Sequence, residues 1–370
     1  MGTVLSEKAI ISTNQFIWMV FSIITSFTTL QIPGILIFHA GRDAWISALL
    51  AWFLDVLLAI VYARMGIRFP GQNFMQYSIT ILGKFWGRII GIMFPLFFLM
   101  VSSLLMRAIS ILVGNTILPE APTVLILLIG YIFIGYAVKK GIEVIGRSCE
   151  ILGPIYLLSF IVLFALVLPK INLSKLRPLF AKGLYPSLSG SIFILSFISI
   201  CIIMGMYIPI CNHIENGFIA KFIALSLGTF VICSVVILSI AIFGTEQASN
   251  TVNPGLMLTQ MANIENVIDR ADVIWFIIAI EAGLMTSVNL IWASSLGISQ
   301  IVGLSTYKPL VYPITLISGI LSIVSFDNYT EILDFAFYSY PFVSIFIGTG
   351  LEVFLFIMAL VLKKRTDIAK

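Results

Sequence analysis

Apolar residues occur in ten long runs that are separated by short polar segments. Runs of roughly 17 to 25 apolar residues can cross the hydrocarbon of a bilayer as helices, which satisfy their own backbone polar groups there. The pattern therefore predicts an all-α integral membrane protein with about ten transmembrane helices. The predicted spans are residues 13–38, 44–63, 86–113, 122–138, 151–168, 188–209, 218–243, 271–302, 310–326 and 332–362.

Composition excludes a separate water-soluble domain. Of the 370 residues, 60% are hydrophobic and 10% are charged, and the mean hydropathy is +1.10, whereas a soluble domain carries about 25% charged residues. Residues 1–370 are therefore interpreted as a single transmembrane domain. Residues 1–12 lack the basic, apolar and small-residue regions of a signal peptide, so the first span is expected to act as its own insertion signal.

No residue pattern points to catalysis, a metal or a cofactor. The four cysteines form no CxxC pair and show no metal-ligand spacing, and the two histidines, His39 and His213, fall toward opposite membrane faces. No nucleophile-base pair and no phosphate-binding glycine loop can be assembled. We therefore expect no enzymatic activity and no cofactor.

The distribution of Lys and Arg predicts the orientation. Of these 21 residues, 14, including Lys221, are assigned to segments on the side of the N-terminus, six lie on the other side and Arg107 lies within a span. Because cytoplasmic loops are enriched in Lys and Arg, both termini are predicted to be cytoplasmic. The basic loop at residues 169–186 by itself favours the opposite orientation, but the Lys and Arg content of the loops on both sides of it favours this one. The net charge of +4 thus reflects topology and does not indicate nucleic-acid binding.

Two of the spans contain helix-breaking residues. The first reads TTLQIPG at residues 28–34, where Pro33 lacks a backbone donor and Gly34 tolerates unusual dihedrals; the sixth reads SICIIMGMYIP at residues 199–209. Breaks in helices one and six of two oppositely directed five-helix halves are typical of secondary transporters with inverted repeats. We expect these halves at residues 13–168 and 188–362. The alternative is a proline kink that neighbouring side chains fill.

Three features together resemble a known family: residues 33–47 (PGILIFHAGRDAWIS), residues 172–179 (NLSKLRPL) and the ten-helix layout. They resemble the B subunits of bacterial spore germinant receptors, which are similar to permeases of the amino acid/polyamine/organocation superfamily. The resemblance implies a leucine-transporter-like fold with a 5+5 inverted repeat, in the bacterial cell membrane or the spore inner membrane. It also implies a germinant ligand, an amino acid or a sugar, and a complex with a larger membrane A subunit and a lipoprotein C subunit.

A fold of this kind places its ligand between the breaks of helices one and six and the middles of helices three and eight. Polar side chains there are candidates because unsatisfied polar groups are expensive in a membrane. The alternatives are hydroxyl bonds to the helix's own carbonyls and ordinary core packing. The break in helix one lacks the glycine-rich turn of amino-acid permeases, which leaves less open backbone. The candidate ligand-binding residues are Thr28, Thr29, Gln31, Val101, Ser102, Ile200, Gly205 and Thr286.

Four charged residues stand out within the predicted spans, where each costs ~2.5 to 3.5 kcal/mol on insertion scales. Asp55 and Arg107 are interpreted first as a structural ion pair, with Glu281 as the alternative partner of Arg107. Arg107 could instead extend toward the membrane surface. Glu281 and Glu352 are the residues that a proton-coupled transporter would use.

These observations leave three functional classes open. The first is a ligand-sensing receptor subunit, in which the bound molecule favours one arrangement of the broken helices. The second is a secondary transporter of amino acids, which would use the same site. The third is a membrane scaffold or channel-forming subunit whose pocket is vestigial.

Overall fold

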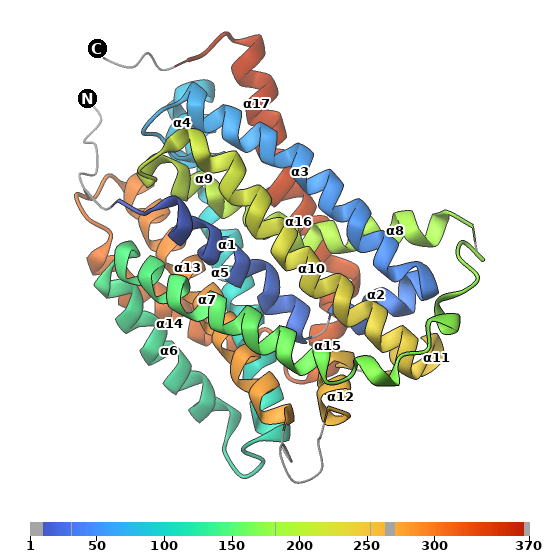
Figure 1. Cartoon of the computed structure of the whole chain (residues 1–370). Helices are drawn as coiled ribbons and strands as arrows, with labels where there is room; N and C mark the ends of the chain where they lie inside the picture. Colours follow the sequence, from blue (N-terminus) through green and yellow to red (C-terminus); the bar gives the residue numbers. More distant parts are fainter. Residues whose placement is uncertain (1–9, 31, 182, 252, 263–270, 366–370) are drawn as a thin grey trace.

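The structure is a computed structural model that describes residues 10–365 except 31, 182, 252 and 263–270, and that describes residues 27–30 by their backbone alone. The described residues form helices and no β-strand, apart from an isolated bridge between Ile11 and Cys211. Figure 1 shows a bundle of long, tilted helices. This arrangement agrees with the all-α architecture expected from hydropathy.

The first half of the chain supplies five spans and one short helix. Helix one consists of α1 and α2, and α4 lies between the second and third spans. The elements are α1 (Thr13–Leu30), α2 (Ile32–Ala40), α3 (Ala44–Arg68), α4 (Phe74–Leu82), α5 (Lys84–Thr116), α6 (Thr123–Lys140) and α7 (Ile142–Ala165).

The second half also supplies five spans. Helix six begins with α8 and continues through the 3-10 segment η4, the short helix α9 and the 3-10 segment η5; helix ten runs from α15 to α17 and contains two π-helical segments, η8 and η9. The elements are α8 (Tyr185–Ile198), η4 (Ser199–Ile203), α9 (Met204–Tyr207), η5 (Ile208–Ile210), α10 (Gly217–Phe243), α11 (Thr245–Ser249), α12 (Pro254–Gln260), α13 (Ala271–Val302), α14 (Val311–Val324), α15 (Tyr329–Asp334), η8 (Phe335–Ser339), α16 (Tyr340–Ser344), η9 (Ile345–Gly350) and α17 (Leu351–Val361).

The number of membrane-length segments supports about ten spans. Within the described residues, eight helical segments are long and apolar enough to cross a membrane, and Lys308–Val324 is a shorter apolar helix. The 18-residue helix α1, which contains no charged residue, supplies the remaining span. The eighth span, Ala271–Val302, agrees with its sequence prediction at both ends.

Three short helices lie outside the predicted spans, and two of them begin at recognisable caps. At the start of α4 the Asn73 side chain accepts a hydrogen bond from the Gln76 amide at 3.3 Å, while the Gln76 side chain accepts one from the Asn73 amide at 3.2 Å. This reciprocal capping box satisfies two amide donors at the helix start. At α12 the Asn253 side chain accepts from the Leu256 amide at 3.0 Å, and Pro254 occupies the first turn. The third short helix is α11.

The centre of the bundle is formed by α1, α5 and α13. Helix α13 packs along α5, and α1 packs against α7, α10 and α13. The α5–α13 contact depends on Gly283, where a Cβ atom would lie only 2.2 Å from Cδ1 of Ile109. Helices α6 and α14 lie at the periphery and expose large apolar side chains such as Ile132 and Leu316, as lipid-facing helices do.

The ends of helices two and ten lie together. The Arg68 side chain, at the end of α3, donates hydrogen bonds to the carbonyl oxygens of Lys364 (2.6 Å) and Ala359 (2.9 Å) at the end of α17. At the start of helix one, the Ile11 amide donates to the Ile210 carbonyl at the end of helix six. Gly66 near the end of α3 packs against Ile208 near the end of helix six, so the beginning of the first span and the end of the tenth lie at the same end of the bundle, as an even number of crossings requires.

Candidate functional site

The break predicted in helix one falls on residues 28–34, and Gln31 within this stretch lies outside the described residues. On either side of it the chain is helical, as α1 (Thr13–Leu30) and α2 (Ile32–Ala40), and α2 contains Pro33. Three of the candidate ligand residues, Thr28, Thr29 and Gln31, lie outside the described residues or have side chains that do.

Helix six loses its α-helical form at Ser199. The five residues of η4 form a 3-10 segment, and α9 and η5 complete the span. Ile200 lies in this segment and is fully buried. Gly205 packs elsewhere, because a Cβ atom there would lie 2.7 Å from the ring of Phe74 in α4. The break is therefore located at the start of the predicted stretch, and Gly205 accommodates α4.

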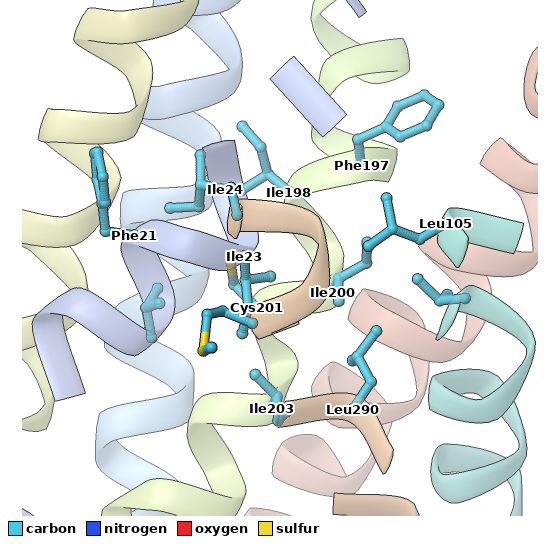
Figure 2. Packing of buried hydrophobic residues seen from close by; sticks show 14 of the residues in the cluster. Phe21, Ile23, Ile24, Leu105, Phe197, Ile198, Ile200, Cys201, Ile203 and Leu290 are labelled. Carbon is cyan, nitrogen blue, oxygen red and sulfur yellow. The ribbon is translucent and has the colours of Figure 1, made fainter. Parts of the chain in front are cut away.

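The second half of α1 and the break in helix six meet in a cluster of apolar side chains (Figure 2). The cluster joins the end of α1 and the break in helix six to α5 and α13. Such surroundings suit an apolar group and disfavour an unpaired charge. The labelled members are Phe21, Ile23, Ile24, Leu105, Phe197, Ile198, Ile200, Cys201, Ile203 and Leu290.

Thr286 connects helix eight to helix one. Its Oγ1 lies 2.8 Å from the Ala282 carbonyl oxygen in its own helix and 3.1 Å from the Ser22 carbonyl oxygen in α1. A hydroxyl has one proton, so these two carbonyls share it. The side chain is fully buried. Thr286 thus lies beside α1, two turns before Leu30.

Helices three and eight each carry a buried hydroxyl that has no partner among the described residues. They belong to Ser102 on α5, a predicted ligand residue, and Ser287 on α13. The preceding residue on α5, Val101, is buried as well. Because buried polar atoms are normally hydrogen-bonded, these hydroxyls are available to a polar group that enters the bundle.

Helix six is bonded to helices eight and ten on either side of its break. The Tyr207 hydroxyl donates to Oδ1 of Asn289 on α13 at 2.7 Å. The Oγ atoms of Ser199 and Ser344 lie 2.6 Å apart and join η4 to α16. None of these residues was among the predicted ligand contacts. If helix six moves, these hydrogen bonds must break or helices eight and ten must move with it.

The predicted ion pair between Asp55 and Arg107 is wrong. The Asp55 carboxylate instead pairs with Lys221 of α10, with Nζ 2.9 Å from Oδ1 and both side chains fully buried. The Lys221 ammonium also lies 4.5 Å from the centre of the Tyr62 ring. The sequence interpretation treated Lys221 as a topology-determining charge at the helix end, whereas it lies inside α10. An ammonium buried at this depth requires a carboxylate partner.

Arg107 is held by backbone carbonyls. Its guanidinium donates to the Phe326 carbonyl from Nε (3.1 Å) and from Nη2 (2.8 Å), and to the Asp327 carbonyl at 3.2 Å. These acceptors follow the end of α14, where carbonyls lack intrahelical partners. Arg107 therefore binds the α14–α15 connection and pairs with neither Asp55 nor Glu281. Oε1 of Glu281 is buried and has no partner among the described residues.

A second buried carboxyl group lies between helix ten and α4. Oε1 of Glu352 accepts a hydrogen bond from the Tyr77 hydroxyl at 2.5 Å, and its Oε2 atom has no partner among the described residues. One turn earlier, the Gly348 carbonyl accepts from the Tyr62 hydroxyl at 3.0 Å. No cation of the described chain lies within ion-pair distance of Glu352. If Glu352 were ionised, its negative charge would have no compensating cation among the described residues.

A cavity of about 220 Å³ lies beside α2. Its walls are formed by α2, the residues after α11, and the start of helix ten. Gly34 allows the close approach here, since a Cβ atom would lie 2.6 Å from the Thr251 carbonyl oxygen. The lining residues are Gly34, Ile35, Phe38, Ser249, Asn250, Thr251, Leu333 and Phe337.

Comparison with known proteins identifies the family. A family model described as spore germination protein matches residues 10–330. The chain belongs to this spore germination protein family. It is similar to spore germination protein KB of Bacillus subtilis, with 26% identity over 98% of each chain, and to spore germination protein YndE of the same organism, with 28% identity over 70% of this chain and 72% of that protein. The resemblance inferred from the sequence is thereby confirmed.

The fold of this spore germination protein is that of a solved transporter. A Na⁺-coupled sialic acid symporter in a substrate-bound, outward-open state matches with a TM-score of 0.61 and 11% identity, over 97% of this chain and 92% of that one. The match confirms the predicted leucine-transporter-like fold. The family and the fold are those of permease-like membrane proteins and not of enzymes.

Removing one charge of the Asp55–Lys221 pair should destabilise the protein, whereas removing both charges should not. Replacing Asp55 by Asn leaves a buried ammonium and should lower the free energy of unfolding by about 3 to 5 kcal/mol. Combining Asp55→Leu with Lys221→Met removes both charges and should recover most of this loss. Unfolding of the purified protein in detergent measures both effects. A double variant as unstable as Asp55→Asn would contradict this account of the pair.

Neutralising Glu352 should destabilise the protein much less than neutralising Asp55. Replacing Glu352 by Gln keeps an acceptor for the Tyr77 hydroxyl and leaves no charge unpaired, so the free energy of unfolding should change by less than about 1 kcal/mol. The same unfolding assay tests this, with Asp55→Asn as the matched comparison. A loss at Glu352→Gln as large as at Asp55→Asn would show that the Glu352 carboxylate has an ionic role.

Proposed function

We propose that this protein is the germinant-sensing membrane subunit of a spore germination receptor, and that it binds an amino acid at mid-membrane between helices one, three, six and eight. Membership of the spore germination protein family supports the process. The observation that carries the site is the position of Thr286, whose hydroxyl on helix eight lies 3.1 Å from the Ser22 carbonyl oxygen in α1, two turns before the predicted break.

The chemistry of the two breaks suits a small zwitterion. The N-terminus of α2 carries partial positive charge and can face a carboxylate, while the C-terminal carbonyls of α1 can accept from an ammonium. The Ser102 and Ser287 hydroxyls add polar groups on α5 and α13. The apolar cluster of Figure 2 suits an apolar side chain of the ligand.

In this proposal, the hydrogen bonds of helix six transmit the signal. A ligand that favours one arrangement of the break shifts the population toward that arrangement. The Tyr207–Asn289 and Ser199–Ser344 bonds connect the break to α13 and α16. A change at the ligand is therefore passed to helices eight and ten, which can in turn present an altered surface to partner subunits.

The partners in this proposal are a larger membrane A subunit and a lipoprotein C subunit. The proposed location is the bacterial cell membrane or the spore inner membrane, with both termini in the cytoplasm or spore core, as the distribution of Lys and Arg predicts. The two halves of the repeat are proposed at residues 13–168 and 188–362.

Transport of an amino acid is the second candidate function, and the match to a symporter fold favours it. The two functions predict different behaviour after reconstitution into liposomes. A sensor should bind an amino acid saturably without gradient-driven accumulation, whereas a transporter should accumulate it. Purified protein is first screened for thermal stabilisation by amino acids and sugars, and uptake of each stabilising compound is then measured. Robust accumulation would reject the sensor in favour of transport.

Thr286→Val should weaken ligand binding. The substitution preserves shape but removes the hydroxyl beside α1, and loss of one hydrogen bond should raise the ligand concentration for half-maximal thermal stabilisation by roughly tenfold. Thr315→Val is the matched control, because Thr315 on α14 is also buried and donates to its own helix, at Val311. Equal ligand response in Thr286→Val and the native protein would remove Thr286 from the site.

A further inference from the structure

A groove with three arginines lies between the ends of helices two and ten. Its volume is about 490 Å³, and it is lined by Arg64, Ile67 and Arg68 of α3 together with Phe356 and Leu360 of α17 and the following Arg365. Arg64 and Arg68 are one turn apart and lie on one face of α3. The groove therefore combines a basic rim with an apolar wall.

The three arginines are not equivalent. Arg68 is committed to the protein, because its guanidinium donates to the Lys364 and Ala359 carbonyls. Arg64 and Arg365 are exposed, and neither lies within ion-pair distance of a carboxylate in the part of the chain that the structure describes. The rim thus carries two guanidinium groups that can bind an anion.

The apolar wall indicates what kind of anion fits. Ile67 and Leu360 are largely exposed, with 56% and 49% of their surface accessible, and Phe356 is half-buried beside them. Free phosphate would leave these side chains uncovered. A phospholipid covers them with its acyl chains while its phosphate lies between the arginines, and basic pockets between transmembrane helices on the cytoplasmic side bind anionic head groups in this way.

We propose that this groove is a binding site for an anionic phospholipid of the cytoplasmic leaflet, such as phosphatidylglycerol. Helix α17 packs against both α3 and α4, and Arg68 already joins it to α3. A lipid bound by Arg64 and Arg365 adds a second connection between helices two and ten. It thereby favours the arrangement in which the Tyr62–Gly348 and Tyr77–Glu352 bonds are made.

The experiment compares lipids on the purified full-length protein in detergent. Phosphatidylglycerol should raise the midpoint of thermal unfolding, and phosphatidylcholine with the same chains should not. The double variant Arg64→Gln with Arg365→Gln should require at least about tenfold more phosphatidylglycerol for half the effect, since each arginine contributes to head-group attraction. If the double variant does not fold, Arg365→Gln alone serves, because Arg365 follows the last helix.

A matched control removes two basic residues elsewhere. Lys139→Gln with Lys140→Gln neutralises the end of α6, where the two ammonium groups lie over the rings of Tyr312 and Tyr136. This variant should keep the native response to phosphatidylglycerol. An equal loss of response would show general electrostatic attraction and would overturn the proposal, as would an unchanged response in the Arg64/Arg365 variant.

Other occupants are distinguished in the same assay. Stabilisation by glycerol phosphate at the concentrations effective for phosphatidylglycerol would identify a small-anion site and reject the lipid. Equal stabilisation by phosphatidylcholine would show a non-specific detergent effect. A response to phosphatidylglycerol that develops only after residues 366–370 are deleted would show that this segment, which contains Asp367, occupies the groove. Each of these results contradicts the proposal.

Discussion

The need to satisfy buried polar groups without water determines most of this structure. Asp55 and Lys221 lie side by side because neither charge is tolerated alone at this depth. Arg107 binds the Phe326 and Asp327 carbonyls just after α14, and Arg68 binds the carbonyls of Ala359 and Lys364 at and beyond the end of α17. Polar residues thus fix the contacts between helices whose lipid-facing surfaces, being uniformly apolar, provide little specificity.

The candidate site combines an apolar lining with unsatisfied hydroxyls. Around the second half of α1 and the break in helix six, the described side chains are largely apolar, and the hydroxyls of Ser102 and Ser287 have no partner among the described residues. A ligand bound there would give these hydroxyls a hydrogen-bonding partner. Ligand binding and helix packing are therefore linked. Such a link suits a sensor and a transporter equally.

Hydropathy predicted about ten spans, with span eight correct at both ends, and the helix-breaking residues suggested two five-helix halves, while the leucine-transporter-like fold followed from the family resemblance. The partner of Asp55 could not be predicted, since Lys221 is 166 positions away and lies near a helix end, where lysine usually marks topology. Arg107 binds backbone carbonyls, and because every residue has one, the residue types in the sequence do not reveal these partners. Helix α4 was missed although its Asn73–Gln76 capping box is visible in the sequence.

Helix ten illustrates how local backbone geometry determines which side chains face inward. Its buried residues Tyr340, Ser344, Gly348 and Glu352 recur every four positions, whereas a regular α-helix rotates such a series steadily away from one face because its period is 3.6. The wider turns of the π-helical segment η9 absorb the surplus residue. The register of Glu352 opposite Tyr77 is consequently a property of that irregular turn: in a regular α-helix with the same number of residues, Glu352 would be rotated away from the face that Tyr340 and Ser344 share.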